Sequence, residues 1–419
     1  MAGWIIFISL TILSIGGYLV WPSRYNIPTH LNVGFVVLAY FIPALIINMQ
    51  DDFPDDVVDL YVKILFVGTI FYLAGLILGF KLKPRKTNFT FDVLSAADYE
   101  AHVTKITRIL LCLGIPCMIL GYLMMGFVPM FAADPVAAKF FRGPYQVPFY
   151  TSIVYLSSFL ILSSITPISI MIWYKNKSKI FYLLATIVAV VLMMMSLSRG
   201  PAFTGVLFGI MIVMSFKSRS SFTVLIVLTI FIYVLSSAFY YIIGVRNLED
   251  VSATLGHDDH VIWRIMAGGT NDVYDQLNFM TFFKANPEWT YGRTVFGGFV
   301  PSHYKWNSSV YTLRVINPGV DISELISGGL RLPGPVWGYV SFQWAGVIIF
   351  SFLSGLIKGV LLKHLKYWIT QHKSILTATV LIVIFITLLD QLSSFYTLSI
   401  YALPPFIVLM FYVYRFRLR

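Results

Sequence analysis

The sequence predicts an all-α protein that crosses a membrane many times, and three observations lead to this prediction. Only 12% of the 419 residues are charged and 58% are hydrophobic, whereas a soluble globular protein carries about 25% charged residues. Apolar runs of about 20 residues, the length that spans a bilayer as a helix, recur along the chain. These runs do not alternate apolar and polar residues as the strands of a transmembrane barrel do.

Eleven apolar runs are predicted to span the membrane. They lie at residues 3–20, 32–49, 58–80, 105–127, 149–174, 180–197, 202–216, 222–243, 335–362, 374–394 and 398–414. We therefore expect eight helices within residues 1–243, one large extracytoplasmic loop at residues 244–332, and three helices within residues 333–419.

The distribution of Lys and Arg predicts an outer N-terminus and an inner C-terminus. If the basic C-terminal residues 415–419 are cytoplasmic, alternation of eleven spans places most basic residues on that side, as the positive-inside rule requires. The opposite orientation inverts this pattern. The formal net charge of +11 is thus explained by cytoplasmic loops, and we expect no nucleic-acid partner.

Outside the membrane, arginine replaces lysine as the main cation. The planar guanidinium holds phosphate or carboxylate by two parallel hydrogen bonds, which lysine cannot do. We therefore expect a substrate-binding role for the outer arginines, against the alternative that they are ordinary surface residues. The candidates are Arg142, which lies in a proline-rich connector, and Arg264, Arg293 and Arg314 in the large loop.

Two further arginines are predicted to lie at the membrane edge. Arg199 sits in a tight turn between two apolar runs, and Arg331 precedes the run at residues 335–362. A charge at this depth is costly unless it is paired or wetted, so such arginines are candidates for function. Together they could clamp a diphosphate; the alternative for Arg199 is snorkelling to lipid headgroups.

The segment Asn271–Lys284 is predicted to form an amphipathic helix inside the large loop. Val273, Leu277 and Met280 recur at helical spacing, and Asn271 is a plausible N-cap. The helix would lie on the membrane surface or cover the mouth of the bundle.

Acidic and histidine residues give weaker signals. Asp390 is the carboxylate that lies well inside a predicted span, and we expect it to form a structural ion pair with Arg199 or Arg331 rather than to act as a base. His257 and His260 flank two aspartates, but no third histidine stands at ligand spacing, so we predict no metal.

Several short motifs resemble those of the Wzy-type O-antigen or oligosaccharide repeat-unit polymerases. The resemblance covers most of the chain, and its topology carries more of the match than its residues. The motifs are Gly126-Phe127-Val128-Pro129, Asp134-Pro135, Ser198-Arg199-Gly200, Tyr291-Gly292-Arg293-Thr294, Phe299-Val300-Pro301-Ser302 and Trp337-Gly338-Tyr339.

The resemblance implies a glycosyltransferase of the C-type fold in the bacterial inner membrane. Such an enzyme joins undecaprenyl-pyrophosphate-linked repeat units into a surface polysaccharide on the outer face, with no cofactor. Its implied partners are the lipid-linked glycan, membrane lipid, and a chain-length regulator and flippase of the same pathway. Arg199 and Arg331 are expected to stabilise charge on the leaving phosphate. His303 is the first candidate for the base, ahead of Glu324 and Asp272.

Three alternative functions stay open at this point. An O-antigen ligase has a similar architecture but transfers the finished chain to lipid A core. A metal-dependent transferase that uses a polyprenyl-phosphate sugar carries an acidic pair in an early outer loop, and the chain has acidic pairs at residues 51–52 and 55–56. A transporter or flippase is the third alternative, although we find no internal repeat.

Overall fold

The computed structural model describes most of the chain, with several internal gaps. The described residues are 1–41, 44, 53–82, 91–93, 96–197, 199–217, 227, 230–231, 272–300, 304–321, 329–371, 374–413 and 416–418. Within them the chain is predominantly helical and forms two compact units. Unit 1 comprises Met1–Lys81, Ile226–Val360 and Leu389–Ile400, and unit 2 comprises Leu82–Leu225, Leu361–Leu388 and Tyr401–Arg419.

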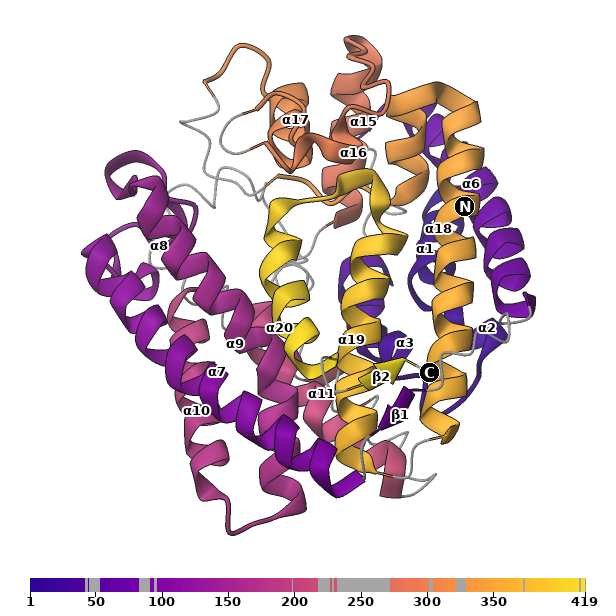
Figure 1. Ribbon diagram of the computed structural model, residues 1–419. Helices are drawn as coiled ribbons and strands as arrows, with labels where there is room; N and C mark the ends of the chain where they lie inside the picture. The colour runs from indigo at the N-terminus through magenta and orange to yellow at the C-terminus, as the bar shows by residue number, and fades with distance from the viewer. Residues whose placement is uncertain are drawn as a thin grey trace. The chain divides into compact units, whose positions relative to one another are not determined.

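Unit 1 is a helical bundle with short helices at one end. Its long helices are α1 (Ala2–Ile15), α6 (Asp55–Lys81) and the greater part of α18 (Gly334–Gln371). Figure 1 shows α15 (Asp272–Ala285), α16 (Thr294–Gly297) and α17 (Ser308–Ile316) gathered at one end of these helices. Short helical segments connect α1 to α6: α2 (Gly17–Val20), α3 (Ile27–Leu31), α4 (Val33–Val36) and a π-helix at Val37–Phe41.

Unit 2 consists mainly of long apolar helices. They are α7 (Ala96–Met125), α9 (Phe149–Lys175), α10 (Ile180–Met195), α11 (Arg199–Lys217), most of α19 (Ile375–Ser393), and α20 (Leu403–Val413). The short α8 (Pro135–Lys139) and the 3₁₀ turns at Pro129–Phe131 and Gly143–Tyr145 lie between α7 and α9. Strand β1 (Phe91–Val93) pairs antiparallel with β2 (Phe416–Leu418), with Phe91 opposite Leu418.

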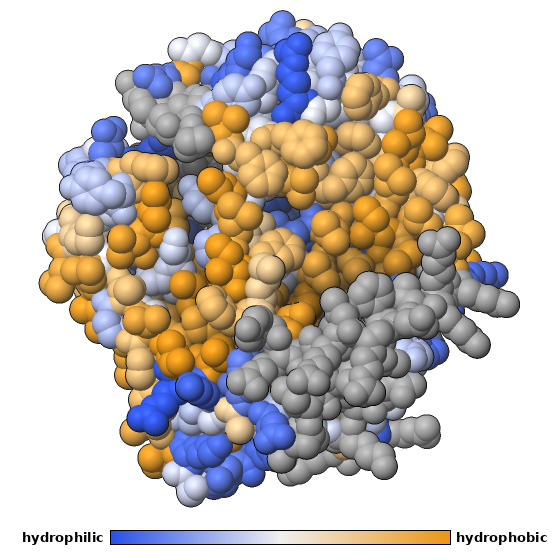
Figure 2. Space-filling model, in the orientation of Figure 1, coloured by the Kyte–Doolittle hydropathy of each residue, from blue (hydrophilic) through white to orange (hydrophobic). Residues whose placement is uncertain are grey.

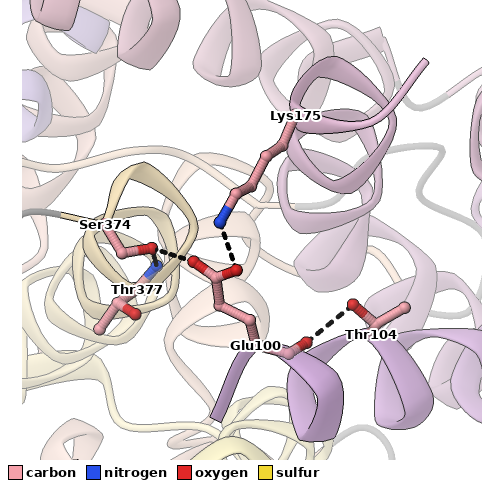
Figure 3. A network of polar contacts seen from close by, with 5 residues as sticks. All are labelled: Glu100, Thr104, Lys175, Ser374 and Thr377. Carbon is pink, nitrogen blue, oxygen red and sulfur yellow. Dashed lines mark hydrogen bonds and ion pairs between the residues drawn. The ribbon is translucent and has the colours of Figure 1, made fainter. Parts of the chain in front are cut away.

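A carboxylate connects three helices of unit 2. Glu100 of α7 accepts hydrogen bonds from Lys175, the last residue of α9, and from Ser374 Oγ at 2.5 Å (Figure 3). Ser374 precedes α19, and its hydroxyl also accepts from the backbone N–H of Thr377 at 3.4 Å. The Glu100 carboxylate thus lies at the N-terminus of α19, where negative charge is favourable.

The chain is a helical membrane protein by the length and composition of its helices. Five described helices are long and apolar enough to cross a membrane: α6, residues Asp98–Met125 of α7, α9, residues Gly334–Thr370 of α18, and α19. Figure 2 shows hydrophobic residues over the sides of the helices and hydrophilic residues towards their ends. This face suits hydrocarbon, because lipid offers no partner for exposed polar groups.

Four further predicted spans appear as shorter apolar helices at Ala2–Ile15, Ile180–Met195, Gly205–Phe216 and Ile400–Val413. The predicted span at 222–243 lies almost entirely outside the described residues, and the span at 32–49 is described only at its start. The number of eleven spans and the C-type glycosyltransferase fold therefore stay predictions.

Opposed glycines hold α6 against α18. A Cβ atom added at Gly75 would lie 2.1 Å from the carbonyl oxygen of Phe352, and one added at Gly355 would lie 2.1 Å from that of Tyr72. Gly79 and Gly359, each four residues further on, make equally close approaches to the opposite backbone. Two small-xxx-small motifs therefore face each other, as in closely packed membrane helices.

A sharp turn divides α18 and corrects the prediction of one continuous span at 335–362. Phe342 (φ −143°, ψ 29°) and Gln343 (φ 53°, ψ −140°) leave helical geometry. A Cβ atom at Gly338 would lie 2.3 Å from the carbonyl oxygen of Gly346, although eight residues of straight helix would separate them by about 12 Å. The first turns of α18 consequently fold back along the helix that follows. They bring Pro335 against Gly68 of α6.

The helix predicted at Asn271–Lys284 is confirmed as α15, at Asp272–Ala285. Val273, Leu277 and Met280 are fully buried and Phe283 is 2% exposed; all four join the core that α1, α6 and α18 share. This places α15 over the bundle of unit 1. The proposed N-cap, Asn271, lies outside the described residues.

Candidate functional site

A polar cavity of about 340 Å³ lies inside unit 1, among otherwise apolar helices. Residues of α1, α6, α15, α18 and the end of α19 line it, together with the segment that leads into α18. Its charged residues are Arg331, Lys358, Asp272 and Asp390, and its hydroxyl-bearing residues are Ser14, Tyr40, Tyr72, Ser351, Ser354, Ser393, Ser394 and Tyr396. Charged groups inside a membrane helix bundle mark functional sites by default.

Arg331 enters the cavity because α15 holds its backbone. The side-chain amide of Gln276, 1% exposed, donates to the carbonyl of Arg331 at 2.7 Å and accepts from the hydroxyl of Tyr61 on α6. The Arg331 side chain is 67% exposed, and one of its guanidinium nitrogens lies 3.8 Å from Asp272 Oδ1. This distance is that of an ion pair and is longer than a hydrogen bond, and the exposed side chain can also be reached from the cavity.

Asp272 is the better enclosed partner of that pair. Its side chain is 8% exposed and sits in the first turn of α15, where the helix dipole favours negative charge. Asp275, one turn further along α15, is also held in low dielectric. Burial raises the pKa of the Asp275 carboxyl to about 6, against a smaller lowering effect of Arg331.

Lys358 supplies the second cation of the cavity from the middle of α18. Its ammonium donates to the backbone carbonyls of Ser14 at 3.0 Å and Leu13 at 3.3 Å, and lies 5.7 Å from the ring centre of Tyr72. Leu13 and Ser14 belong to the last turn of α1, which ends at Ile15. Carbonyls of a last turn have no partner within their own helix and attract cations.

Asp390 lines the same cavity, although its charged neighbour differs from the expected one. Lys358 is the positive group that acts on its carboxyl, whereas we expected Arg199 or Arg331. Lys358 faces this cavity from α18; the Arg199 side chain lies outside the described part of the chain, so the expected pairing of Asp390 with an arginine stays a prediction.

Two of the loop arginines lie in unit 1 with partners of their own. The guanidinium of Arg293 stacks over Trp306 at 4.9 Å from the ring centre. Arg314 donates to both carboxylate oxygens of Glu288 and, at 3.2 Å, to the carbonyl of Lys305. Its fork is therefore already occupied, and Arg314 and Glu288 line a separate pocket near α17.

The other predicted residues do not share this cavity within the described structure. Arg142 belongs to unit 2, where its backbone N–H donates to Ala137 at 2.9 Å. Arg199 is the first residue of α11, also in unit 2, and its side chain lies outside the described part of the chain. Arg264, His303 and Glu324 lie outside the described residues too. The predicted clamp of Arg199 with Arg331 therefore stays a prediction.

Sequence reasoning missed two residues that line the cavity, Lys358 and Gln276, and it missed Asp275, which interacts electrostatically with Arg331. Lys358 carried a usable signal, since it interrupts an apolar run inside the Gly355-x3-Gly359 motif. Gln276 and Asp275 lie next to the apolar stripe of α15, but their partners come from α6 and from the segment before α18. No local pattern reveals such contacts.

No metal centre is evident in the described residues. They contain no group of three or more His, Cys, Asp or Glu side chains placed to hold an ion. The acidic pair at the start of α6 is Asp55 and Asp56, and Asp56 forms an ion pair with Lys284 of α15. His257 and His260 lie outside the described residues.

Comparison with models of protein families, with curated proteins and with solved structures found no match. The site is therefore interpreted from its own chemistry. Two cations, two carboxylates and several hydroxyls, enclosed by apolar helices, suit an anionic head group that carries hydroxylated substituents and an apolar tail.

Proposed function

We propose that this protein is a glycosyltransferase that joins undecaprenyl-pyrophosphate-linked oligosaccharide repeat units into a surface polysaccharide. The observation that carries the proposal is the cavity of unit 1, where Arg331 and Lys358 lie with Asp272 and Asp390 inside an apolar bundle. A lipid-linked diphosphate sugar has matching parts: an apolar tail, an anionic link and a hydroxylated glycan.

The proposed reaction is a single displacement at the anomeric carbon. A hydroxyl of the acceptor unit attacks this carbon, and the bond to the diphosphate oxygen breaks. Negative charge grows on the diphosphate, and a preorganised guanidinium at Arg331 stabilises it more in the transition state than in the ground state. The energy of the step resides in the donor, so the proposal requires no nucleotide.

The acceptor hydroxyl must lose a proton during this step. Of the three base candidates, Asp272 is the one within the described residues, and it lines the cavity beside Arg331. We assign the proton to its carboxylate, which then releases the proton to water. Arg199 and His303 remain candidates for a second phosphate contact and an alternative base.

The decisive experiment is a polymerisation assay with purified protein and undecaprenyl-pyrophosphate-linked repeat unit. The wild type should produce a ladder of glycan lengths and release undecaprenyl pyrophosphate. Arg331→Lys keeps the charge but loses the fork, and Arg331→Ala loses both. Removing one such donor typically lowers kcat by about 10²–10³.

Arg108→Ala is the matched control, since this exposed arginine on α7 contacts the ring of Phe181 and acts electrostatically on Tyr182, both in unit 2 and not among the residues that line the cavity. It should retain the full ladder. A normal ladder from Arg331→Ala would refute the role of Arg331.

The same assay separates the rival functions. A product that appears only when lipid A core is added would indicate a ligase. Loss of activity with a chelator and recovery with a divalent cation would indicate the metal-dependent transferase. Movement of the lipid across liposomes without glycan growth would indicate a flippase.

A further inference from the structure

We propose that Lys358 is the residue by which the cavity distinguishes a diphosphate carrier from a monophosphate carrier. The inference rests on the proposed function and assigns the carrier class to the same site. Arg331 lies on the segment before α18, and Lys358 lies beyond the turn at Phe342 and Gln343. An anion with one phosphate can be held at Arg331 alone, whereas one with two phosphates also reaches a second cation.

Three helices, α1, α6 and α18, together determine the position of Lys358. The opposed glycines of α6 and α18 bring the two backbones together on both sides of this residue. The last turn of α1 offers two carbonyls, and Tyr72 of α6 offers the face of its ring. A desolvated ammonium gains from both kinds of contact, so the charge is maintained inside an apolar helix.

Lys358 retains capacity for a ligand. An ammonium has three N–H donors, and the described hydrogen bonds to Leu13 and Ser14 use two of them. Asp390 lines the cavity near the ammonium and acts on it electrostatically. The carboxylate therefore balances Lys358 when no anion is bound and competes with an anion that arrives.

Substitution of Lys358 and substitution of Asp390 should therefore change the affinity for a diphosphate in opposite directions. Removing the charge of Lys358 takes away the second anchor, so a diphosphate should bind more weakly while a monophosphate changes little. Removing the charge of Asp390 takes away the competitor, so a diphosphate should bind more tightly. A general disruption of the bundle would instead weaken both ligands in both variants.

The test measures binding of undecaprenyl pyrophosphate and undecaprenyl phosphate to the full-length protein in detergent. The wild type should prefer the diphosphate. Lys358→Met should lower this preference roughly tenfold, the size expected for one charge-assisted hydrogen bond, with monophosphate affinity changed less than about twofold. Lys358→Arg should retain most of the preference, and Asp390→Asn should increase it.

Inorganic pyrophosphate and phosphate, used as competitors, show whether the preference resides in the phosphates or requires the lipid. The same ratio and the same variant pattern place the recognition in the phosphates, as proposed. An unchanged ratio in Lys358→Met, or an equal fall for both lipids, would overturn the inference and leave the proposed function standing. If the wild type binds neither lipid, the proposed function fails as well.

Discussion

At the residue scale, Gln276 is the side chain that joins α15, α6 and the approach to α18. Its amide accepts from Tyr61 and donates to the carbonyl of Arg331, and it is almost completely buried. A buried amide whose partners are removed costs about 1–3 kcal/mol. The two bonds, however, have separate consequences, because only one of them positions Arg331.

We therefore expect Gln276→Leu and Tyr61→Phe to lower stability to a similar degree but to differ in activity. Tyr61→Phe leaves the bond to Arg331 in place, so kcat should stay within a few fold of wild type. Gln276→Leu frees the Arg331 segment, so kcat should fall by roughly tenfold or more. Thermal unfolding and the polymerisation assay measure the two effects. Equal kcat values for the two variants would contradict the positioning role.

Asp275 should make the stability of the protein depend on pH. Its pKa in the folded state is about 6 because of burial, above the ordinary value of 3.8 for an aspartate, so the folded protein binds this proton more tightly than the unfolded chain. The resulting stabilisation is fully present below about pH 4 and is lost as the pH rises through 6. At pH 8 the ionised carboxylate should cost on the order of 3 kcal/mol.

Asp275→Asn should accordingly flatten the profile of unfolding temperature between pH 4 and 8, with its largest gain in stability at high pH. The matched control is Asp59→Asn, an exposed aspartate in an i, i+4 pair with Lys63 on α6, where an exposed pair contributes little. Parallel profiles for Asp275→Asn and the wild type would exclude Asp275 as the source.

The residues of the cavity also show how much of a site can be predicted from a sequence. Arg331 and Asp390 stood out because a charge beside or inside an apolar run is conspicuous. Lys358 was not among the predicted site residues, because the sequence alone does not tell which side of α18 faces the protein. The contacts of Gln276 join positions 55 and 215 residues apart. Tertiary packing, not local pattern, sets them.

At the scale of the elements, the glycine contact between α6 and α18 sets the geometry of the cavity wall. A methyl group at Gly75 would meet the carbonyl oxygen of Phe352 at 2.1 Å, and backbone atoms at such a contact cannot move aside. Overpacking of this kind costs roughly 1–3 kcal/mol. It should also shift Lys358, which follows Gly355 by three positions on the same helix.

We expect Gly75→Ala to lower the unfolding temperature and to reduce the preference for diphosphate over monophosphate. Ala74→Val adds bulk to the exposed face of the same helix and should change neither quantity. Both are measured on purified protein in one detergent. If Gly75→Ala matched Ala74→Val in both measurements, the close contact would not be maintained in solution.

The helices themselves were the most predictable part of the fold. Four predicted runs correspond to observed helices: 58–80 to α6, 105–127 to α7, 149–174 to α9 and 374–394 to α19. Most of the predicted ends lie within a few residues of the observed ends. Their length and composition leave no other structure in lipid. The turn inside α18 was not predicted, because Phe342 and Gln343 lie within the predicted span and neither is a glycine or a proline. Their backbone angles and the close approach of Gly338 to Gly346 reveal the turn.

At the scale of the whole molecule, the basic residues predict an orientation that the helices alone do not determine. The rule counts Lys and Arg near the ends of spans, and the inward position of Lys358 removes one residue from that count. The remaining cations still favour an inner C-terminus, because Lys175, Lys177 and Lys179 cluster in one turn between α9 and α10. The large loop, which includes Lys305, would then lie outside.

Labelling of single cysteines in intact cells tests this orientation. The native Cys112 and Cys117 are free and exposed, so both are first replaced by Ser. In that background, Lys305→Cys should react with a membrane-impermeant maleimide in cells whose outer barrier alone is opened. Lys177→Cys should react only after the inner membrane is also permeabilised. Both positions are exposed and lie outside the five long apolar segments, so access depends on the membrane side alone. The reverse pattern would place the α9–α10 turn outside and the proposed glycan-binding end in the cytoplasm, where polymerisation of a surface polysaccharide is excluded.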